Sequence, residues 1–243
     1  MRLKRLWQKL NILTLRTVKD SYALSGNALL NHLHGACVSK FEPSADISAK
    51  IACLANQLIQ DGKTPYIIPT GGSDCVGALG YVNCARELAE QAADFGLEID
   101  ALVHATDSAG TQAGLLVGLA AIQSDIHLLG IGVRAAQDQQ EQLVFNLAHR
   151  TAQHLGTGVK IARKDVPVNC GYVCAASELP SDSMVRSLKL LAQTEGLLFD
   201  PVSSGKGLVG LITLVKQVYF AGMKNFIFLH PGGTAALFGS PTI

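Results

Sequence analysis

The strongest constraint on the fold is a series of short apolar segments in which hydrophobic and polar residues do not alternate. The segments "IDALVHAT" (99–106), "IHLLGIGV" (126–133) and "NFIFLH" (225–230) indicate buried strands, and "NILTLR" (11–16) and "PYIIP" (65–69) are further strand candidates. Strands that are apolar throughout are typical of parallel sheets covered by helices on both faces. We therefore expect an α/β fold with parallel sheets in three α/β/α layers.

The segments between these strands have the period of a helix. Hydrophobic residues recur every three or four positions in 25–35, 47–62, 70–96, 141–156 and 183–196. We also predict helices at 110–123, which is apolar on nearly all sides, and at 205–222. Glycines stand where helices would end, as Gly35 and Gly62 do. A weak signal for a domain boundary lies between Gly62 and Pro65.

Composition excludes several classes of protein. Apolar residues make up 48% of the 243 residues and charged residues 16%, which is typical of a globular chain with a sizeable core. The formal net charge of +1, without a basic stripe, predicts no nucleic-acid partner. No stretch of about 18 apolar residues occurs, so we expect no membrane span.

The cysteines and the basic N-terminus bear on location. The six cysteines form no CxxC pair, which disfavours a zinc ribbon or a redox motif; they are Cys37, Cys53, Cys75, Cys84, Cys170 and Cys174. We interpret them as buried free thiols of a cytoplasmic protein. The N-terminus is rich in Lys and Arg, with no acid before Asp20, as in a transit peptide. A basic helix followed by a strand is the alternative that we prefer.

Three glycine-rich turns follow predicted strands: "TGGSDCVG" (70–77), "TDSAGTQAG" (106–114) and "HPGGTAALFG" (230–239). In open parallel sheets, ligands bind outside the carboxyl ends of the strands. We therefore expect the three turns to lie on one rim of the sheet.

The second of these turns has the chemistry of a phosphate cradle. Ser108–Gln112 joins a strand to a helix N-terminus, where backbone N–H groups and the helix dipole favour an anion. Ser108 and Thr111 add hydroxyl donors, and Gly110 allows close approach. The alternative is an ordinary turn with a Ser or Thr N-cap. The P-loop pattern and the GxGxxG dinucleotide pattern are absent, which disfavours a nicotinamide-dependent dehydrogenase.

The histidines and one lysine are interpreted as structural. His104 and His230 stand at strand ends without a second ligand at metal spacing, so we expect histidines with satisfied hydrogen bonds and no metal site. Lys206 stands at a helix start, where a cation is unfavourable, and is interpreted as a solvated side chain.

Taken in order, five segments resemble one family. They are "YIIPTGGSDCVGALGYVNCARELAEQ", "VHATDSAGTQAGLLVGL", "LLGIGVRA", "LLAQTEGLLFDPVSSGKGLVGLI" and "FIFLHPGGTAALFG". The chain resembles, over about residues 12–239, the D-cysteine desulfhydrases and aminocyclopropane-carboxylate deaminases. These are pyridoxal-phosphate enzymes of the tryptophan-synthase-β-like fold, also called fold type II.

The resemblance implies a cofactor, a reaction and a set of contacts. It implies that Ser108, Ala109, Gly110, Thr111 and Gln112 wrap the phosphate of pyridoxal 5′-phosphate, that Ser203 and Ser204 lie beside its ring, and that Gly232 lies near the pyridine nitrogen. The implied reaction converts D-cysteine, a small amino acid, into pyruvate, sulfide and ammonia. The resemblance also implies a homodimer, with residues 1–63 as part of a smaller N-terminal domain and residues 64–243 as the larger cofactor-binding domain.

The chain departs from the family pattern at several positions. The family's Schiff-base lysine lies in a segment upstream of the first match, so we expect an N-terminally shortened chain and assign no catalytic residue. Ser203 stands in place of a tyrosine, Pro231 in place of a hydroxyl residue and Asp107 in place of a small residue; the segment 171–180 is also altered. Two hypotheses remain: a D-cysteine desulfhydrase-type lyase, or an inactive relative that keeps only a phosphate-ligand site.

Overall fold

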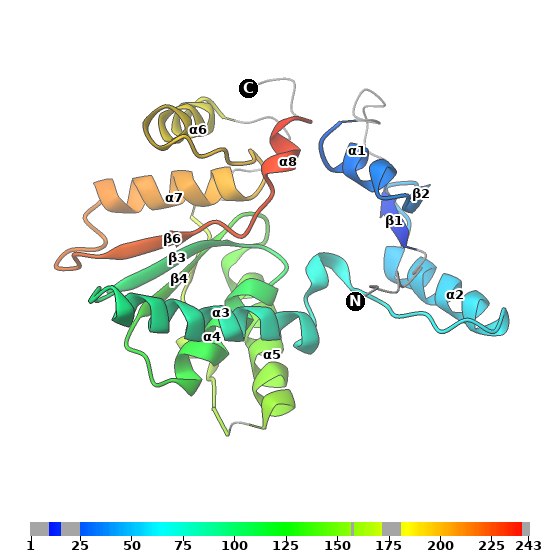
Figure 1. The fold of residues 1–243 in the computed structure, drawn as a ribbon, viewed down its shortest axis with the longest axis horizontal. Helices are drawn as coiled ribbons and strands as arrows, with labels where there is room; N and C mark the ends of the chain where they lie inside the picture. The colour runs from blue at the N-terminus through cyan, green and yellow to red at the C-terminus, as the bar shows by residue number, and fades with distance from the viewer. Residues whose placement is uncertain (1–9, 16–24, 157, 172–180, 240–243) are drawn as a thin grey trace, which may run out of the picture. The chain divides into compact units, whose positions relative to one another are not determined.

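The computed structural model describes residues 10–15, 25–156, 158–171 and 181–239 (Figure 1). The chain divides into two compact units, one that runs to Ile68 and one from Pro69 to Leu237. The altered segment 171–180 lies almost entirely outside the described residues, as do the basic N-terminus up to residue 9 and Cys174. The domain boundary after residue 63 stays a prediction.

The first unit pairs two short parallel strands with two helices. Its elements are β1 (Asn11–Leu15), α1 (Gly26–Leu33), β2 (Cys37–Phe41) and α2 (Ile47–Gln60). Helix α2 begins where the Asp46 carboxylate accepts a hydrogen bond from the Ala49 N–H at 3.0 Å. The two predicted helices and the strand at 11–16 are confirmed. The strand predicted at 65–69 is wrong, because that segment lies in no sheet.

The second unit contains a four-stranded parallel sheet in the order β5–β4–β3–β6 (Figure 1). Its strands are β3 (Ala101–Thr106), β4 (His127–Gly132), β5 (Val168–Asn169) and β6 (Phe226–Leu229). The central strand β3 is buried along nearly its whole length. The three apolar segments predicted as buried strands are thus confirmed, and β5 is a two-residue addition.

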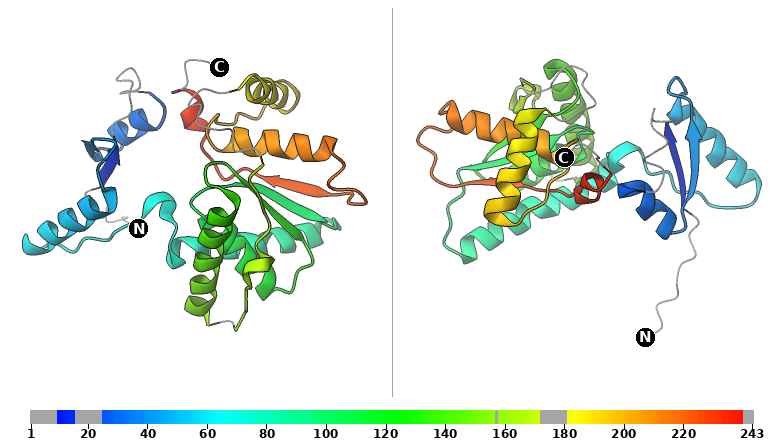
Figure 2. Two further views of the ribbon diagram at one scale, coloured as in Figure 1. Left: turned by 180° about the vertical axis from the view of Figure 1, so that it is seen from behind. Right: turned by 90° about the horizontal axis from the view of Figure 1, so that it is seen from above.

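Helices cover both faces of this sheet, as predicted. On one face lie α3 (Cys75–Asp94), α4 (Gly110–Ala121) and α5 (Gln137–Leu155), and on the other α6 (Asp182–Glu195) and α7 (Ser204–Lys216). Figure 2 shows the second group on the opposite side of the strands from the first. The short helices are η2 (Thr70–Gly72), η3 (Arg163–Asp165) and α8 (Thr234–Leu237). The second unit is therefore a three-layer α/β/α arrangement.

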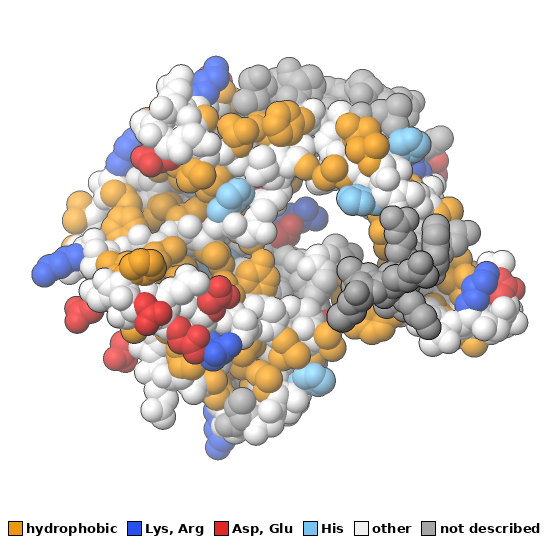
Figure 3. Space-filling model, in the orientation of Figure 1, with side chains coloured by type: hydrophobic (Ala, Val, Ile, Leu, Met, Phe, Trp, Pro, Cys, Tyr) orange, Lys and Arg blue, Asp and Glu red, His pale blue; other side chains and the backbone are white. Residues whose placement is uncertain are grey.

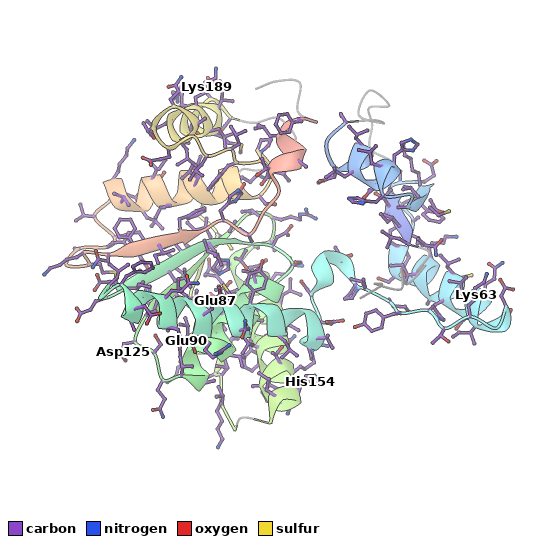
Figure 4. All side chains as sticks on the ribbon, in the orientation of Figure 1. Lys63, Glu87, Glu90, Asp125, His154 and Lys189 are labelled. Carbon is purple, nitrogen blue, oxygen red and sulfur yellow. The ribbon has the colours of Figure 1, made fainter. Side chains whose placement is uncertain are left out.

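The core of this unit lies on both sides of the sheet. One cluster joins Leu102 of β3 to α4 and α5, while Val103, the next residue, packs with α7 on the other face. Helices α3 and α4 approach closely, since a Cβ on Gly114 would overlap the α3 backbone. The labelled Glu87 and Glu90 of α3 lie on its outer side (Figure 4). Alternate faces of β3 thus hold the two helical layers.

The surface is mixed in chemistry. Hydrophobic, acidic and basic side chains are interspersed on the face shown in Figure 3. Within the described ranges, no helix has the length and apolar character that a membrane span requires. The prediction of buried cysteines is wrong for the five described: Cys37 and Cys53 are exposed, and Cys75, Cys84 and Cys170 are partly buried. All five are free thiols.

Candidate functional site

The candidate site lies on the rim formed by the carboxyl ends of the parallel strands. Strands β3 and β6 are parallel neighbours, with His104 opposite Leu229, so the turns that follow them leave the same edge of the sheet. The turn at 70–73 meets the turn after β3 through a 2.8 Å hydrogen bond between the Ser73 and Ser108 hydroxyls. The predicted clustering of the glycine-rich turns on one rim therefore matches the structure.

The turn after β3 exposes the N-terminus of α4. The N-cap residue, Ala109, has a left-handed backbone (φ 76°) although it is not glycine, which is an uncommon and strained conformation. Alanine has no side-chain oxygen, so it cannot cap the first turn of the helix. The N–H groups of Thr111 and Gln112 follow in that turn and have no acceptor within the helix. An anion at this point would accept hydrogen bonds from them.

The side chain of Gln112 faces away from the rim. It is fully buried, and its Nε2 donates to the Pro167 carbonyl oxygen at 2.7 Å. A Cβ on Gly130 of β4 would overlap its carboxamide, so the side chain lies on the sheet. Gln112 can therefore contribute its backbone N–H to a bound phosphate but not its side chain. Ser108, by contrast, is exposed, and Thr111 is half-buried.

Charged residues surround this turn. Asp107, which precedes Ser108, forms an ion pair with Arg134 at 3.1 Å. The guanidinium partly neutralises the Asp107 carboxylate next to the cradle, which reduces the electrostatic repulsion between this carboxylate and a bound phosphate. Lys206 donates from Nζ to the Val133 carbonyl oxygen at 3.2 Å and is only partly exposed. The prediction of a solvated Lys206 is therefore wrong, because this bond draws the amine to the end of β4.

A second part of the rim is organised by Asp200, whose side chain is buried. Its carboxylate accepts hydrogen bonds from the N–H groups of Val202, Ser203 and Ser204 at 2.7–3.0 Å, and also from the Ser204 hydroxyl. The carboxylate thus neutralises the N-terminus of α7 from within the chain. The turn after β6 packs on it, since a Cβ on Gly233 would come within 2.6 Å of the carboxylate.

Two of the three residues predicted to lie beside the cofactor, Ser203 and Ser204, are hydrogen-bonded directly to Asp200. Ser204 is buried and Ser203 is half-buried, and both lie at the start of α7. Gly232 is exposed and has a φ of 130°, a backbone conformation that favours glycine. The contact of these residues with a cofactor stays a prediction.

The two histidines at strand ends differ in their surroundings. His104 is fully buried in β3; its Nδ1 lies 2.9 Å from the Ala105 carbonyl oxygen, and its Nε2 has no hydrogen-bond partner. Burial lowers the pKa of His104 to about 4. His230 stacks on Phe199 with ring centroids 4.0 Å apart, and its Nδ1 has no hydrogen-bond partner either. The expectation of satisfied histidines is therefore wrong for one nitrogen of each ring. Within the described part of the chain, no three side chains gather as metal ligands would.

Comparison with known proteins places this chain in a family. Residues 8–232 match the family model described as "Pyridoxal-phosphate dependent enzyme". The chain belongs to this family. Pyridoxal phosphate is the family's cofactor, and the cradle after β3 offers the donors that its phosphate requires.

Among individual members of the family, the chain is similar to D-cysteine desulfhydrases. The chain is 36% identical over 222 residues to the D-cysteine desulfhydrase of Yersinia pestis (strain Pestoides F), which covers 91% of this chain and 66% of the relative. The D-cysteine desulfhydrase of Salmonella paratyphi C (strain RKS4594) matches to the same extent. The chain thus spans about two thirds of the length of these relatives.

Solved structures support the fold. The structure titled as an ACC deaminase homologue superimposes with a TM-score of 0.81 at 25% identity, covering 95% of this chain and 76% of that chain. Serine racemase from Dictyostelium discoideum superimposes with a TM-score of 0.54 at 14% identity, covering 93% of this chain and 68% of the other, and shows the fold alone. The predicted fold type II architecture is confirmed.

Proposed function

We propose that this chain provides the phosphate-binding site of a pyridoxal-phosphate-dependent lyase, and that the phosphate is held by the turn Ser108–Gln112. The observation that carries the proposal is a difference between helix N-termini on the rim. Helix α3 is capped by the Asp74 carboxylate and α7 by the Asp200 carboxylate, whereas the N-cap of α4 is an alanine and its first turn has no acidic residue. Helix α5, which follows β4, also has an alanine N-cap but carries Asp138 in its first turn. Of these four termini, that of α4 is therefore the one without a carboxylate and is left for an external anion.

The donors at this terminus suit a phosphate. Backbone N–H groups of Thr111 and Gln112 and the exposed hydroxyl of Ser108 would each donate to phosphate oxygens. When bound, pyridoxal phosphate supplies an electron sink for bond cleavage next to the amino group of an amino acid. Ser203, Ser204 and Gly232 are proposed to lie beside its ring. The Asp200 carboxylate would act on them indirectly, by fixing the start of α7 and the turn after β6.

The proposed reaction is the α,β-elimination of D-cysteine, which with one molecule of water gives pyruvate, sulfide and ammonia. The 36% identity to D-cysteine desulfhydrases supports this substrate class of small amino acids. A homodimer is proposed from the family resemblance and a cytoplasmic location from the free cysteines. Sedimentation analysis of the purified protein tests the first.

A second candidate is an inactive relative that binds the phosphate of the cofactor without catalysis. Two positions favour it. Ser203 cannot provide the phenol of the family's tyrosine, and Pro231 offers no side-chain donor where the family has a hydroxyl residue.

Two measurements on the purified protein separate these candidates. Borohydride treatment with pyridoxal phosphate, read by mass spectrometry, reports whether one lysine is labelled, and a pyruvate assay with D-cysteine reports turnover. Labelling of one lysine with pyruvate release supports the lyase. Phosphate-dependent binding without either supports the inactive relative. Absence of binding would refute both.

A further inference from the structure

The turn at 70–73 contacts the phosphate cradle from outside it. Ser73 precedes α3 and lies more than thirty residues before the cradle in the sequence. Its Oγ accepts a hydrogen bond from the Gly110 N–H at 3.2 Å and donates one to Ser108 Oγ at 2.8 Å. One half-buried hydroxyl therefore joins two different donors of the cradle.

The direction of these bonds matters for a phosphate. Because Ser73 donates its proton to Ser108 Oγ, the Ser108 proton is available to an acceptor outside the two turns. Ser108 is exposed, so that acceptor would lie in the cradle. Hydrogen bonds in such a chain polarise one another, which strengthens the last donor. Ser73 would thus orient the hydroxyl that meets the phosphate.

The two turns are also fitted to each other sterically. A Cβ on Gly71 would overlap the Ser108 side chain, and a Cβ on Gly110 would come within 2.8 Å of Ser73 Oγ. Gly71 has a φ of 68°, so the turn that presents Ser73 requires a left-handed residue at that point. Each turn therefore has a glycine where the other turn's serine lies against it.

We propose that Ser73 is a positioning residue of the phosphate site, which holds the Ser108 hydroxyl and the backbone at Gly110 in the geometry that receives the phosphate. This proposal rests on the proposed function. It adds the turn before α3 to a site that the sequence motif confines to the turn after β3. Ser73 acts through Ser108 and Gly110, without a required contact of its own to the ligand.

The test measures binding of pyridoxine 5′-phosphate by equilibrium dialysis, with unphosphorylated pyridoxine as the reference. Pyridoxine phosphate has no aldehyde, so its binding does not depend on a covalent bond to a lysine. We expect Ser73→Ala to weaken binding of the phosphorylated ligand about 5- to 20-fold, the range for losing one or two organising hydrogen bonds, and to leave pyridoxine binding unchanged. Ser73→Thr keeps the hydroxyl and should restore most of the affinity.

The matched control is Ser124→Ala. Ser124 follows the other end of α4 and accepts a hydrogen bond from the Ile126 N–H at 3.3 Å. The Ser124→Ala variant should have a melting temperature lowered about as much as that of Ser73→Ala, and its affinity for pyridoxine 5′-phosphate should be unchanged. If both variants weaken binding equally, or if Ser73→Ala binds like the wild type, Ser73 is a structural residue and the proposal is wrong.

Two further variants sharpen the test. In a Ser108→Ala background, Ser73→Ala should have a smaller effect than in the wild type, because it acts through Ser108; equal effects would contradict this. If Ser73→Ala does not fold, Ser73→Cys takes its place, since a thiol is a weaker partner for both bonds. Wild-type affinity of that variant would overturn the proposal. A wild-type protein that does not bind pyridoxine phosphate refutes the proposed function itself, which separates the two failures.

Discussion

His104 makes the stability of this protein depend on pH in a way that can be calculated. Its imidazole is fully buried in β3, and desolvation lowers its pKa from 6.5, the value of an exposed histidine, to about 4; its bond to the Ala105 carbonyl is a smaller, opposing effect. The folded pKa lies below the unfolded one, so the unfolded chain takes up the proton first. The stability due to neutral His104 is therefore complete above pH 6.5 and is lost as the pH falls toward 4.

The magnitude follows from the pKa difference. Between pH 7.5 and pH 4.5, protonation of His104 in the unfolded chain alone should lower the free energy of unfolding by about 2–3 kcal/mol. Because domains of this size are stable by about 5–15 kcal/mol, such a loss is a substantial part of the total. Other groups titrate in the same range, so the comparison must be made between variants.

The assay is urea denaturation followed by circular dichroism at both pH values. His104→Gln should reduce the change in unfolding free energy between pH 7.5 and pH 4.5 by about 2–3 kcal/mol relative to the wild type. The control, His127→Gln, replaces a partly buried histidine at the start of the neighbouring strand β4 and should leave most of that change in place. If His104→Gln shows the same pH dependence as the wild type, the buried neutral imidazole is not the cause and the reasoning is refuted.

Three further changes test the packing and the rim by thermal unfolding. Gly114→Val should destabilise the protein by about 1–3 kcal/mol because its side chain would overlap the α3 backbone, whereas Gly80→Ala, with open space around it, should not; equal effects would contradict this packing. Ala109→Gly should raise stability by about 1 kcal/mol by relieving its left-handed backbone, and a loss would refute that strain. Asp200→Asn should lower the free energy of unfolding by about 1.5–3 kcal/mol, because it removes the charge that accepts three N–H bonds. The control Asp182→Asn, at an exposed residue, should lower it far less. If Asp200→Asn leaves the stability unchanged, this carboxylate does not hold the turn.

The sequence predicts the central sheet well, because strands with helices on both faces are apolar on both sides. It predicts the edges less well. Strand β2 was missed because "CVSKF" contains a serine and a lysine, and its pairing with β1 is a contact between distant residues. The segment 65–69 was wrongly predicted as a strand. Pro65 and Pro69 lack the N–H that a ladder needs, and Tyr66 is 70% exposed.

The position of the site on the rim of the sheet can be predicted from the sequence, but the contacts that support the cradle cannot. The cradle Ser108–Gln112 follows from a local motif. The roles of Ser73 and Asp200 depend on folding, since Ser73 meets a turn distant in sequence and Asp200 lies against the turn after β6. One local signal could have found Asp200. An acidic residue three or four positions before a helix start can accept its first N–H groups.

The most direct test of the central claim is a crystal structure of the protein with pyridoxine 5′-phosphate bound. The account predicts phosphate oxygens within hydrogen-bonding distance of the Thr111 and Gln112 N–H groups and of the Ser108 hydroxyl. It also predicts that the pyridine ring of the ligand lies toward Asp200 and the start of α7. A phosphate bound at another helix N-terminus, or away from the rim, would contradict the account.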